Sequence, residues 1–523
     1  MGRMSHRNHE RTERRISAAT SLLMCALTVL AQIAVTLLLV HLLKEKASFV
    51  YALLQFVGVL VAIRVYQRTG SPSYKLSWMC LLLILPVSGM ILFCLWGGTH
   101  QAKQLSLKSV PPIPQRESVK MLSGMNQAAL TRRSPAWGRL SAYLQKREFW
   151  LYRNTNAAYF EEGEAFFRDL VQHLNQAETY IFMEYYILAE GSVWDEIFAA
   201  LRERAAAGVE IHLIIDDFGT LTRLSDETLQ TIRDAGIEVE IFNPVHRYIS
   251  RLYFNYRDHL KITVIDGDTA YTGGINIGDE YANRMERFGH WKDTAVMLKG
   301  EAVWNMTAMF LHMWNVVTNN RQDSSLEEYL PHVWHPEVFE GDGFIQPFCD
   351  SPLDNETVGE NVYLNIINRA RDYVYICTPY LVIDNEMMTA LCLAAKSGVD
   401  VRLMTPGIPD KKLVFLLTQS YYEQLLEAGV KIYEYQPGFL HAKSFVCDDE
   451  IGVVGTINLD YRSLYLHFED GVWIYRNKVI GDIKKDFTDT LDYCNPVTLE
   501  FCRGRNIAVR AMQSILRLFA PML

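Results

Sequence analysis

The chain has 523 residues, which is enough for two or three domains that each bury a core. Residues 151–523 hold 32 basic and 55 acidic residues, a net charge of −23. A surface that binds the phosphates of nucleic acid is normally basic, so this balance argues against a nuclease or another nucleic-acid binder. The nine cysteines form no CxxC pair, which argues against a structural zinc site or a disulfide scaffold.

The N-terminal region, residues 1–100, contains three long apolar segments: 16–43, 47–66 and 76–99. The first and third are long enough to cross a hydrocarbon core of ~30 Å as helices, and the second needs its ends to reach the interface. We therefore expect an N-terminal membrane region of about three helices. A cleaved signal peptide is the alternative for the first segment, but its apolar run is too long and two more follow. Basic residues flank the region on both sides, so the positive-inside rule leaves its orientation open.

A basic segment, residues 101–150, follows the apolar region. It holds nine basic and two acidic residues, a net charge of +7. We expect a linker whose charge suits anionic lipid headgroups, although a solvated linker explains the same composition.

The remainder of the chain alternates strand-like and helix-like segments, and the order occurs twice. A strand, a helix and a second strand are expected over 177–219 and again over 371–407. AGIEVEIFNP at 235–244 then matches AGVKIYEYQP at 428–437, at an offset of 193 residues. This pattern predicts an α/β fold built by tandem duplication, with one domain over 151–335 and the other over 336–523.

Each half of the duplication contains the same polar triplet within an apolar segment. HLKITVID begins at residue 259 and HAKSFVCD at residue 441, and both follow the pattern HxKxxxxD. The six candidate catalytic residues are His259, Lys261, Asp266, His441, Lys443 and Asp448. Burying charge is unfavourable unless the charge is paired or functional, so two copies in register indicate a functional site rather than chance.

Two histidines and two lysines suit the cleavage of a phosphodiester. One imidazole can attack phosphorus, while the other protonates the leaving alkoxide and later takes a proton from an alcohol or water. The lysines would stabilise the charge of the transition state. Asp266 and Asp448 could orient or balance these groups, and Asn276 and Asn458 could donate to phosphate oxygens. This chemistry requires no metal or other cofactor, and no further ligands stand at metal-binding spacings.

Other polar residues have less specific interpretations. Glu184 and Glu469 either face the site or are structural carboxylates. Asp216 and Asp217 end a strand, where capping or a turn is favoured over a metal pair. We expect ordinary surface or core roles for the remaining noted histidines, His246, His290 and His467.

Paired HxKxxxxD segments, each followed by glycine and asparagine, resemble the phospholipase D superfamily, and within it the chain closely resembles the bacterial cardiolipin synthases. The resemblance also rests on KLSWMCLLLILPVSGMILF, GGINIGDEY, WKDTAV and GTINLDYRSLYLHFED, which together span nearly the whole chain. It implies two tandem phospholipase D-like domains, with mixed sheets flanked by helices, preceded by N-terminal transmembrane helices. In this family the two halves share one site, which makes His259 the nucleophile and His441 the acid and base, or the reverse.

The resemblance also implies an activity. The family transfers a phosphatidyl group from one phosphatidylglycerol to another through a covalent phosphohistidine, which gives cardiolipin and glycerol. The implied partners are an anionic phospholipid and the bilayer, without nucleic acid, and the implied location is the bacterial cell membrane with several spans. The alternatives are a phospholipase D-type hydrolase or another phosphatidyltransferase, such as a phosphatidylserine synthase. An inactive lipid-binding scaffold is a third alternative, against which the two complete triplets argue.

Overall fold

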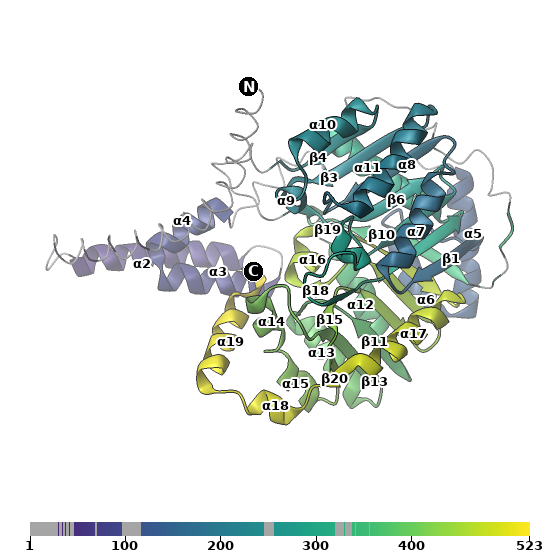
Figure 1. Cartoon of the computed structure of the whole chain (residues 1–523). Coiled ribbons are helices and arrows are strands. Elements are labelled where there is room, and N and C mark those ends of the chain that lie inside the picture. The colour runs from purple at the N-terminus through teal and green to yellow at the C-terminus, as the bar shows by residue number, and fades with distance from the viewer. Residues whose placement is uncertain are drawn as a thin grey trace, which may run out of the picture. The chain divides into compact units, whose positions relative to one another are not determined.

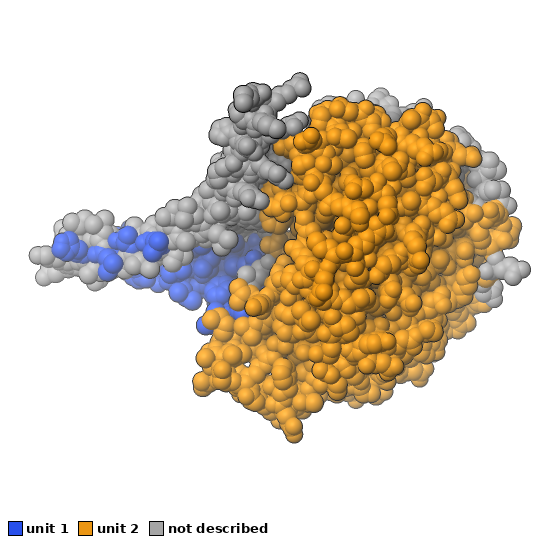
Figure 2. Space-filling view, in the orientation of Figure 1, with its two compact units in different colours: residues 1–108, 244–255, 514–523 blue, residues 109–243, 256–513 orange. Residues whose placement is uncertain are grey.

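The computed structural model describes residues 47–67, 71–96, 117–244, 256–318 and 337–522, apart from residues 340, 342 and 355, together with Tyr329 and isolated positions between 30 and 41. The chain divides into two compact units (Figure 2). The small unit comprises residues 1–108, 244–255 and 514–523, and the large unit comprises residues 109–243 and 256–513. Both HxK segments belong to the large unit.

The described part of the small unit consists mainly of three apolar helices, α2 (Ala47–Tyr66), α3 (Pro72–Ile84) and α4 (Pro86–Trp96). Within the described residues, Phe49–Tyr66 of α2 is the one stretch whose length and composition would let a helix cross a membrane. The expected helix over 16–43 lies outside the described residues, except for isolated positions.

The third apolar segment does not form the single continuous helix that we expected over 76–99. It breaks at Leu85, whose backbone has φ −124° and ψ 72°. Pro86 explains the break, because it lacks a backbone N–H and disfavours the helical conformation of the preceding residue. The rings of Trp78 in α3 and Phe93 in α4 lie 5.2 Å apart, so the two helices fold back on each other. The third predicted span is therefore corrected to a pair of short packed helices.

Part of the expected basic linker is helical. It forms α5 (Glu117–Arg133) and α6 (Pro135–Gln145) in the large unit. The residues of α5 that are buried, Val119, Ser123, Asn126 and Leu130, recur at helical spacing. Their burial, together with the hydrogen bond from Asn126 Nδ2 to the carbonyl oxygen of Leu151 at 2.9 Å, fixes α5 to the fold that follows.

The first half of the large unit contains a seven-stranded mixed sheet (Figure 1). Its strand order is β1-β9-β7-β6-β2-β3-β4, with the last three strands parallel to one another and the other pairs antiparallel. The strands are β1 (Thr155–Phe160), β2 (Tyr180–Tyr185), β3 (Glu210–Asp216), β4 (Glu238–Phe242), β6 (Lys261–Ile265), β7 (Thr269–Gly273) and β9 (Ala295–Gly300).

The second half repeats this order. Its sheet runs β10-β19-β17-β16-β11-β13-β14, again with three parallel strands at one end, and β20 is added beyond β14. The strands are β10 (Phe344–Asp350), β11 (Tyr373–Cys377), β13 (Asp400–Pro406), β14 (Lys431–Tyr435), β16 (Ser444–Cys447), β17 (Ile451–Gly455), β19 (His467–Tyr475) and β20 (Cys494–Pro496). The expected duplicated α/β fold with mixed sheets is therefore confirmed.

Helices connect the strands and cover the sheets. They are α7 (Gly163–Leu174), α8 (Ser192–Ala206), α9 (Asp217–Thr220), α10 (Asp226–Asp234), α11 (Val303–Thr318), α12 (Val358–Ile367), α13 (Asn385–Lys396), α14 (Lys412–Thr418), α15 (Tyr422–Glu427), α16 (Tyr461–Tyr465), α17 (Val479–Thr490), α18 (Leu499–Arg503) and α19 (Ile507–Phe519).

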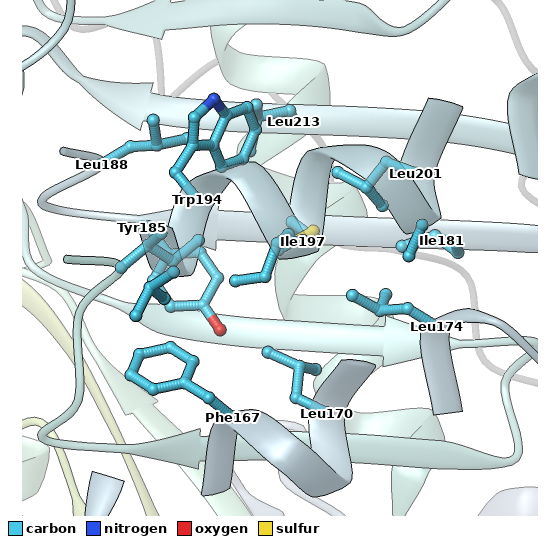
Figure 3. Close-up of a cluster of buried hydrophobic side chains, with 14 of the residues drawn as sticks. Phe167, Leu170, Leu174, Ile181, Tyr185, Leu188, Trp194, Ile197, Leu201 and Leu213 are labelled. Carbon is cyan, nitrogen blue, oxygen red and sulfur yellow. The ribbon is translucent and has the colours of Figure 1, made fainter. Parts of the chain in front are cut away.

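One face of the first sheet carries the core that Figure 3 shows. Phe167 and Leu170 of α7 and Trp194 and Ile197 of α8 pack there with Tyr185 of β2. These side chains are at most 2 % exposed. Parallel strands need helices over their faces, which explains why apolar residues continue along β2 and β3 instead of alternating with polar ones.

Helix α11 joins the two halves. It is apolar around most of its circumference and is buried along most of its length. Phe310 of α11 stacks on Phe182 of β2, with ring centroids 4.7 Å apart. On another face, Nδ2 of Asn305 donates to the carbonyl oxygen of Pro347 in β10 at 2.9 Å. The helix thus contacts both sheets and fixes one half of the repeat against the other.

Candidate active site

Each HxK segment is held by hydrogen bonds to the opposite half. His259 lies between β5 (Arg257–Asp258) and β6, and β5 pairs in parallel with β19 of the second half. His441 lies between β15 (Gly438–Leu440) and β16, and β15 pairs in parallel with β8 (His290–Lys292) of the first half. These pairings bring the two sequence-predicted motifs into one interface.

The imidazoles are oriented by carboxylates that come from the opposite half. Nδ1 of His259 shares a hydrogen bond with Oε2 of Glu469 at 2.8 Å. Nδ1 of His441 shares one with Oδ2 of Asp293 at 2.6 Å. A carboxylate on Nδ1 fixes the ring orientation and favours the tautomer whose Nε2 is free to react.

The two lysines are buried beside their histidines. Lys261 Nζ donates to the carbonyl oxygen of His259 at 2.6 Å, and Lys443 Nζ donates to that of His441. Burial lowers the pKa of Lys261 to about 8 and that of Lys443 to about 7. Two ammonium groups that share a buried space create a strongly favourable position for an anion such as a phosphodiester.

Burial also lowers the pKa of both histidines. The pKa of His441 falls to about 4, with the charge of Lys443 adding to the effect of burial. The pKa of His259 falls well below its usual value, because of burial and then the charges of Lys261, His467 and Lys443. Burial raises the pKa of Glu469 as it lowers that of His259, so burial opposes separated charges on this pair.

Asp266 and Asp448 contact neither histidine, contrary to the orienting role that we expected. The Asp266 carboxylate accepts hydrogen bonds from the backbone N–H groups of residues 178–180, at 2.7–3.0 Å. Asp448 accepts equivalent bonds from residues 371–373 at 2.8–3.0 Å. Each lies at the far end of its strand, where it fixes the start of the adjacent strand. Strand geometry explains the difference, because four strand residues separate each Asp from the lysine at the site.

The two asparagines have different surroundings. Oδ1 of Asn276 accepts from the backbone N–H of Ile187, and Nδ2 donates to the Tyr281 hydroxyl at 2.9 Å. The Tyr281 ring packs edge-on against His441, so Asn276 supports the second histidine indirectly. Asn458 is buried, and its Oδ1 finds no hydrogen-bond partner among the described residues.

A glycine makes room for one of the orienting carboxylates. A Cβ atom on Gly274 would lie 2.0 Å from Oδ1 of Asp293 and 3.0 Å from the carbonyl oxygen of His441. The corresponding residue of the second half is Thr456, whose hydroxyl donates to Oε2 of Glu469 at 2.5 Å. Gly274 is thus required because the Asp293 carboxylate and the backbone of His441 lie too close to leave room for a side chain.

The walls around the two histidines differ. His441 is surrounded by the rings of Trp291, Phe439 and Tyr281, with centroids 5.5–5.8 Å away. His259 contacts the rings of Tyr186 and His467, at 5.0 and 5.6 Å. The second histidine therefore has the more apolar surroundings.

His467, for which we expected an ordinary role, lies in the site. Its ring is nine-tenths buried, and neither nitrogen has a hydrogen-bond partner among the residues that the structure describes. Ligand atoms of His467, His259 and Glu469 lie within 4.8 Å of one another, a spacing that a metal ion could bridge. The positive charges of Arg462, Arg257 and Lys261, which contribute with burial to the low pKa of His467, disfavour a cation there.

The remaining candidates have mainly structural contacts. Asp216 caps α9 through the N–H groups of Phe218 and Gly219 and pairs with Arg257 Nε at 2.9 Å, which confirms the expected capping. Glu184 is fully buried, and its pKa is raised by burial and by the neighbouring charge of Asp258. His290 contacts the Tyr435 hydroxyl, and His246 lies outside the described residues.

A model of the family described as cardiolipin synthase, phospholipase D-like domain, matches residues 170–314 and 363–491. The matched segments cover both halves and contain both HxK segments, which agrees with two half-sites that meet in one place. The class of protein that the fold and the site define is therefore a phospholipase D-like enzyme with a duplicated domain.

Relatives identify the family more closely. The chain is 32 % identical to a cardiolipin synthase of Halalkalibacterium halodurans, over 89 % of this chain and 92 % of the relative. It is 35 % identical to a cardiolipin synthase of Clostridium perfringens, over 87 % and 95 %. An uncharacterized protein of Streptococcus mutans is 43 % identical, over 86 % and 96 %. The chain belongs to the cardiolipin synthase family, as the sequence motifs predict.

A solved structure supports the fold assignment. The crystal structure of a phosphatidylserine synthase of Haemophilus influenzae aligns with a TM-score of 0.53 and 15 % sequence identity. The alignment covers 70 % of this chain and 93 % of the other. At this identity the likeness concerns the fold alone.

Proposed function

We propose that the chain synthesises cardiolipin by transferring a phosphatidyl group from one phosphatidylglycerol to a second, with release of glycerol. The observation that carries the proposal is the reciprocal pairing of His259 with Glu469 and of His441 with Asp293. Each half supplies one imidazole, and it also supplies the carboxylate that orients the imidazole of the opposite half. The halves therefore form one site with two histidines and two lysines.

The first step forms a covalent intermediate. Nε2 of His259 attacks phosphorus, and the bond from phosphorus to the glycerol oxygen breaks. His441 gives its Nε2 proton to that oxygen, and glycerol leaves. The bound phosphodiester raises the pKa of His441 from its low value, because its negative charge favours the imidazolium. Lys261 and Lys443 stabilise the charge on the phosphoryl oxygens.

The second step transfers the phosphatidyl group. Nε2 of His441, now neutral, takes the proton of a primary hydroxyl on the second phosphatidylglycerol. That oxygen attacks phosphorus and the bond from phosphorus to His259 Nε2 breaks, which restores both imidazoles. One phosphodiester replaces another, so the lipid alcohol must reach the intermediate in preference to water. The aromatic wall around His441 supports this preference by limiting water at the acceptor side.

The assignment of roles can be tested with a substrate whose leaving group needs no proton. Phosphatidyl-p-nitrophenol releases p-nitrophenolate without an acid. We expect His441→Ala to release a burst of about one equivalent of p-nitrophenolate and then stall, because the intermediate lacks its base. His259→Ala should give no burst. The opposite result would exchange the two roles, and a normal steady state in either variant would contradict a shared site.

We also infer a membrane location for the enzyme. The apolar stretch Phe49–Tyr66 supports at least one span, and the apolar segment 16–43 of the sequence supports a further one, which gives several passes in the bacterial cell membrane. A bilayer concentrates phosphatidylglycerol at the site, which favours transfer over hydrolysis.

The decisive assay supplies phosphatidylglycerol alone to the detergent-solubilised protein, with a chelator and without nucleotide. We expect cardiolipin and glycerol in equal amounts. Phosphatidic acid as the main product would instead indicate a phospholipase D-type hydrolase. Turnover that requires free serine or another alcohol would indicate a different phosphatidyltransferase. His259→Ala and His441→Ala serve as the inactive controls for each outcome.

A further inference from the structure

The C-terminal helix α19 has polar and apolar residues on opposite faces. Arg510, Gln513 and Arg517 recur at helical spacing on one face. Ile507, Met512 and Ile515 belong to the apolar face, together with the small residues Ala508 and Ala511. In a soluble protein a helix of this kind normally turns its apolar face to the core.

In α19 the large apolar side chains do not face the core. Gln513 is buried, and Nε2 of its side-chain amide donates to the carbonyl oxygen of Leu416 at 3.1 Å. The apolar face points outward, with Ile507 86 % exposed, Met512 47 % and Ile515 55 %. Of the polar residues, Gln513 meets the protein and Arg510 is exposed, while three large apolar side chains meet the surroundings, which in water is unfavourable.

The charge of the segment indicates what covers this face. Residues 501–523 hold four arginines and no lysine, aspartate or glutamate, although the chain as a whole is acidic. An apolar stripe beside arginines is the pattern of a helix that lies in the headgroup region of an anionic bilayer. Phe501 of α18, just before the helix, is also 48 % exposed.

The end of the helix belongs to the apolar small unit. The backbone carbonyl of Leu518 accepts a hydrogen bond from the Ser77 hydroxyl of α3 at 2.7 Å. Met522 packs with the buried cluster around Trp78 and Leu82. The residues that carry the exposed apolar face of α19 (yellow in Figure 1) are thus followed directly in the chain by residues that pack against the apolar N-terminal helices.

We propose that α19 is a second membrane contact of this protein, an interfacial helix whose Ile507, Met512 and Ile515 enter the surface of a bilayer that contains anionic phospholipid. This contact is additional to the N-terminal apolar helices and does not depend on catalysis. It would hold the large unit at the level of the lipid headgroups.

Photo-crosslinking of the full-length protein in liposomes tests the proposal. The liposomes contain phosphatidylglycerol with a diazirine in one acyl chain, and His259→Ala protein is used so that the lipid is not consumed. Trypsin cleaves at the arginines of the segment and gives peptides 506–510 and 511–517. We expect lipid adducts on both peptides, at least tenfold above the adducts on peptide 121–132 of α5.

A pair of matched variants identifies the face. Ile507→Ser with Ile515→Ser should reduce the adducts on 506–517 at least tenfold, while Met121→Ser with Met125→Ser, at positions of similar exposure on α5, should leave them unchanged. Adducts no stronger on α19 than on α5, or adducts that persist in the α19 double variant, would overturn the proposal. A concentration-dependent dimer that the α19 double variant abolishes would also overturn it, because a second copy would then cover the face.

Discussion

Oε2 of Glu469, in the second half of the duplicated unit, lies 2.8 Å from Nδ1 of His259 in the first half. The reciprocal contact, from Asp293 Oδ2 to His441 Nδ1, is 2.6 Å long. Each half therefore orients the histidine of the other. This exchange ties the reactive geometry to the interface between the halves.

Removal of an orienting carboxylate should slow the chemical step. We expect Glu469→Ala and Asp293→Ala to lower kcat by ~10²-fold or more, because the imidazole loses its fixed tautomer and orientation. KM for phosphatidylglycerol should change much less. Product assays in mixed micelles measure both constants. Glu203→Ala, at an exposed carboxylate on α8, is the control and should match the wild type. Unchanged kcat in either site variant would refute the orienting role.

Substitution of the aspartates of the HxKxxxxD pattern should lower the stability of the fold rather than kcat. Asp266→Asn weakens bonds to three backbone N–H groups, and we expect the free energy of unfolding to fall by about 1–3 kcal/mol. Asp448→Asn should behave alike. Thermal denaturation measures the loss, and kcat per folded molecule should stay within about threefold of wild type, given that neither carboxylate contacts a histidine. A collapse of kcat at unchanged Tm would restore the catalytic role.

The lysines should limit activity at alkaline pH. Burial lowers the pKa of Lys443 to about 7 and that of Lys261 to about 8. A lysine with a lowered pKa loses its proton as the pH rises through that value, so kcat/KM should fall as the pH rises through about 7 to 8. Bound phosphodiester favours the ammonium form, so the fall in kcat should begin at higher pH.

The variant Lys443→Arg tests whether deprotonation of Lys443 causes the alkaline fall in kcat/KM, because arginine stays charged throughout this pH range. The variant should be slower at pH 7, yet its kcat/KM should fall less on the alkaline side. An identical alkaline limb in wild type and variant would assign the limb to Lys261 or to another group.

Gly274 should tolerate no side chain. The Cβ atom of Gly274→Ala would displace the Asp293 carboxylate, so we expect kcat to fall at least ~10-fold through the loss of its bond to His441. Gly481→Ala in α17, where an added Cβ meets no atom within 4 Å, is the matched control and should leave kcat unchanged. It should also raise the free energy of unfolding by up to about 1 kcal/mol through helix propensity. Full activity of Gly274→Ala would show that Asp293 can shift without consequence.

The histidines and lysines could be predicted from sequence because the repeat preserves their types and spacing. Asp293 and Glu469 also occupy matching positions, since Ala295 pairs with Gly273 as Gly471 pairs with Gly455. Their types differ, however, and each serves the opposite half. Aligning the two halves of the sequence therefore does not reveal that each carboxylate contacts the histidine of the opposite half. The break at Pro86 was readable from proline stereochemistry, but hydropathy alone predicts a continuous span.

The pairing of β5 with β19 and of β15 with β8 means that each half completes the other in the same way. Two identical copies of a single half could satisfy the same contacts as a symmetric dimer. Fusion into one chain removes the requirement that both copies carry the same residue. Trp291 now stands where the other copy has His467, and Phe439 where it has Arg257. The surroundings of the two histidines were thereby free to diverge.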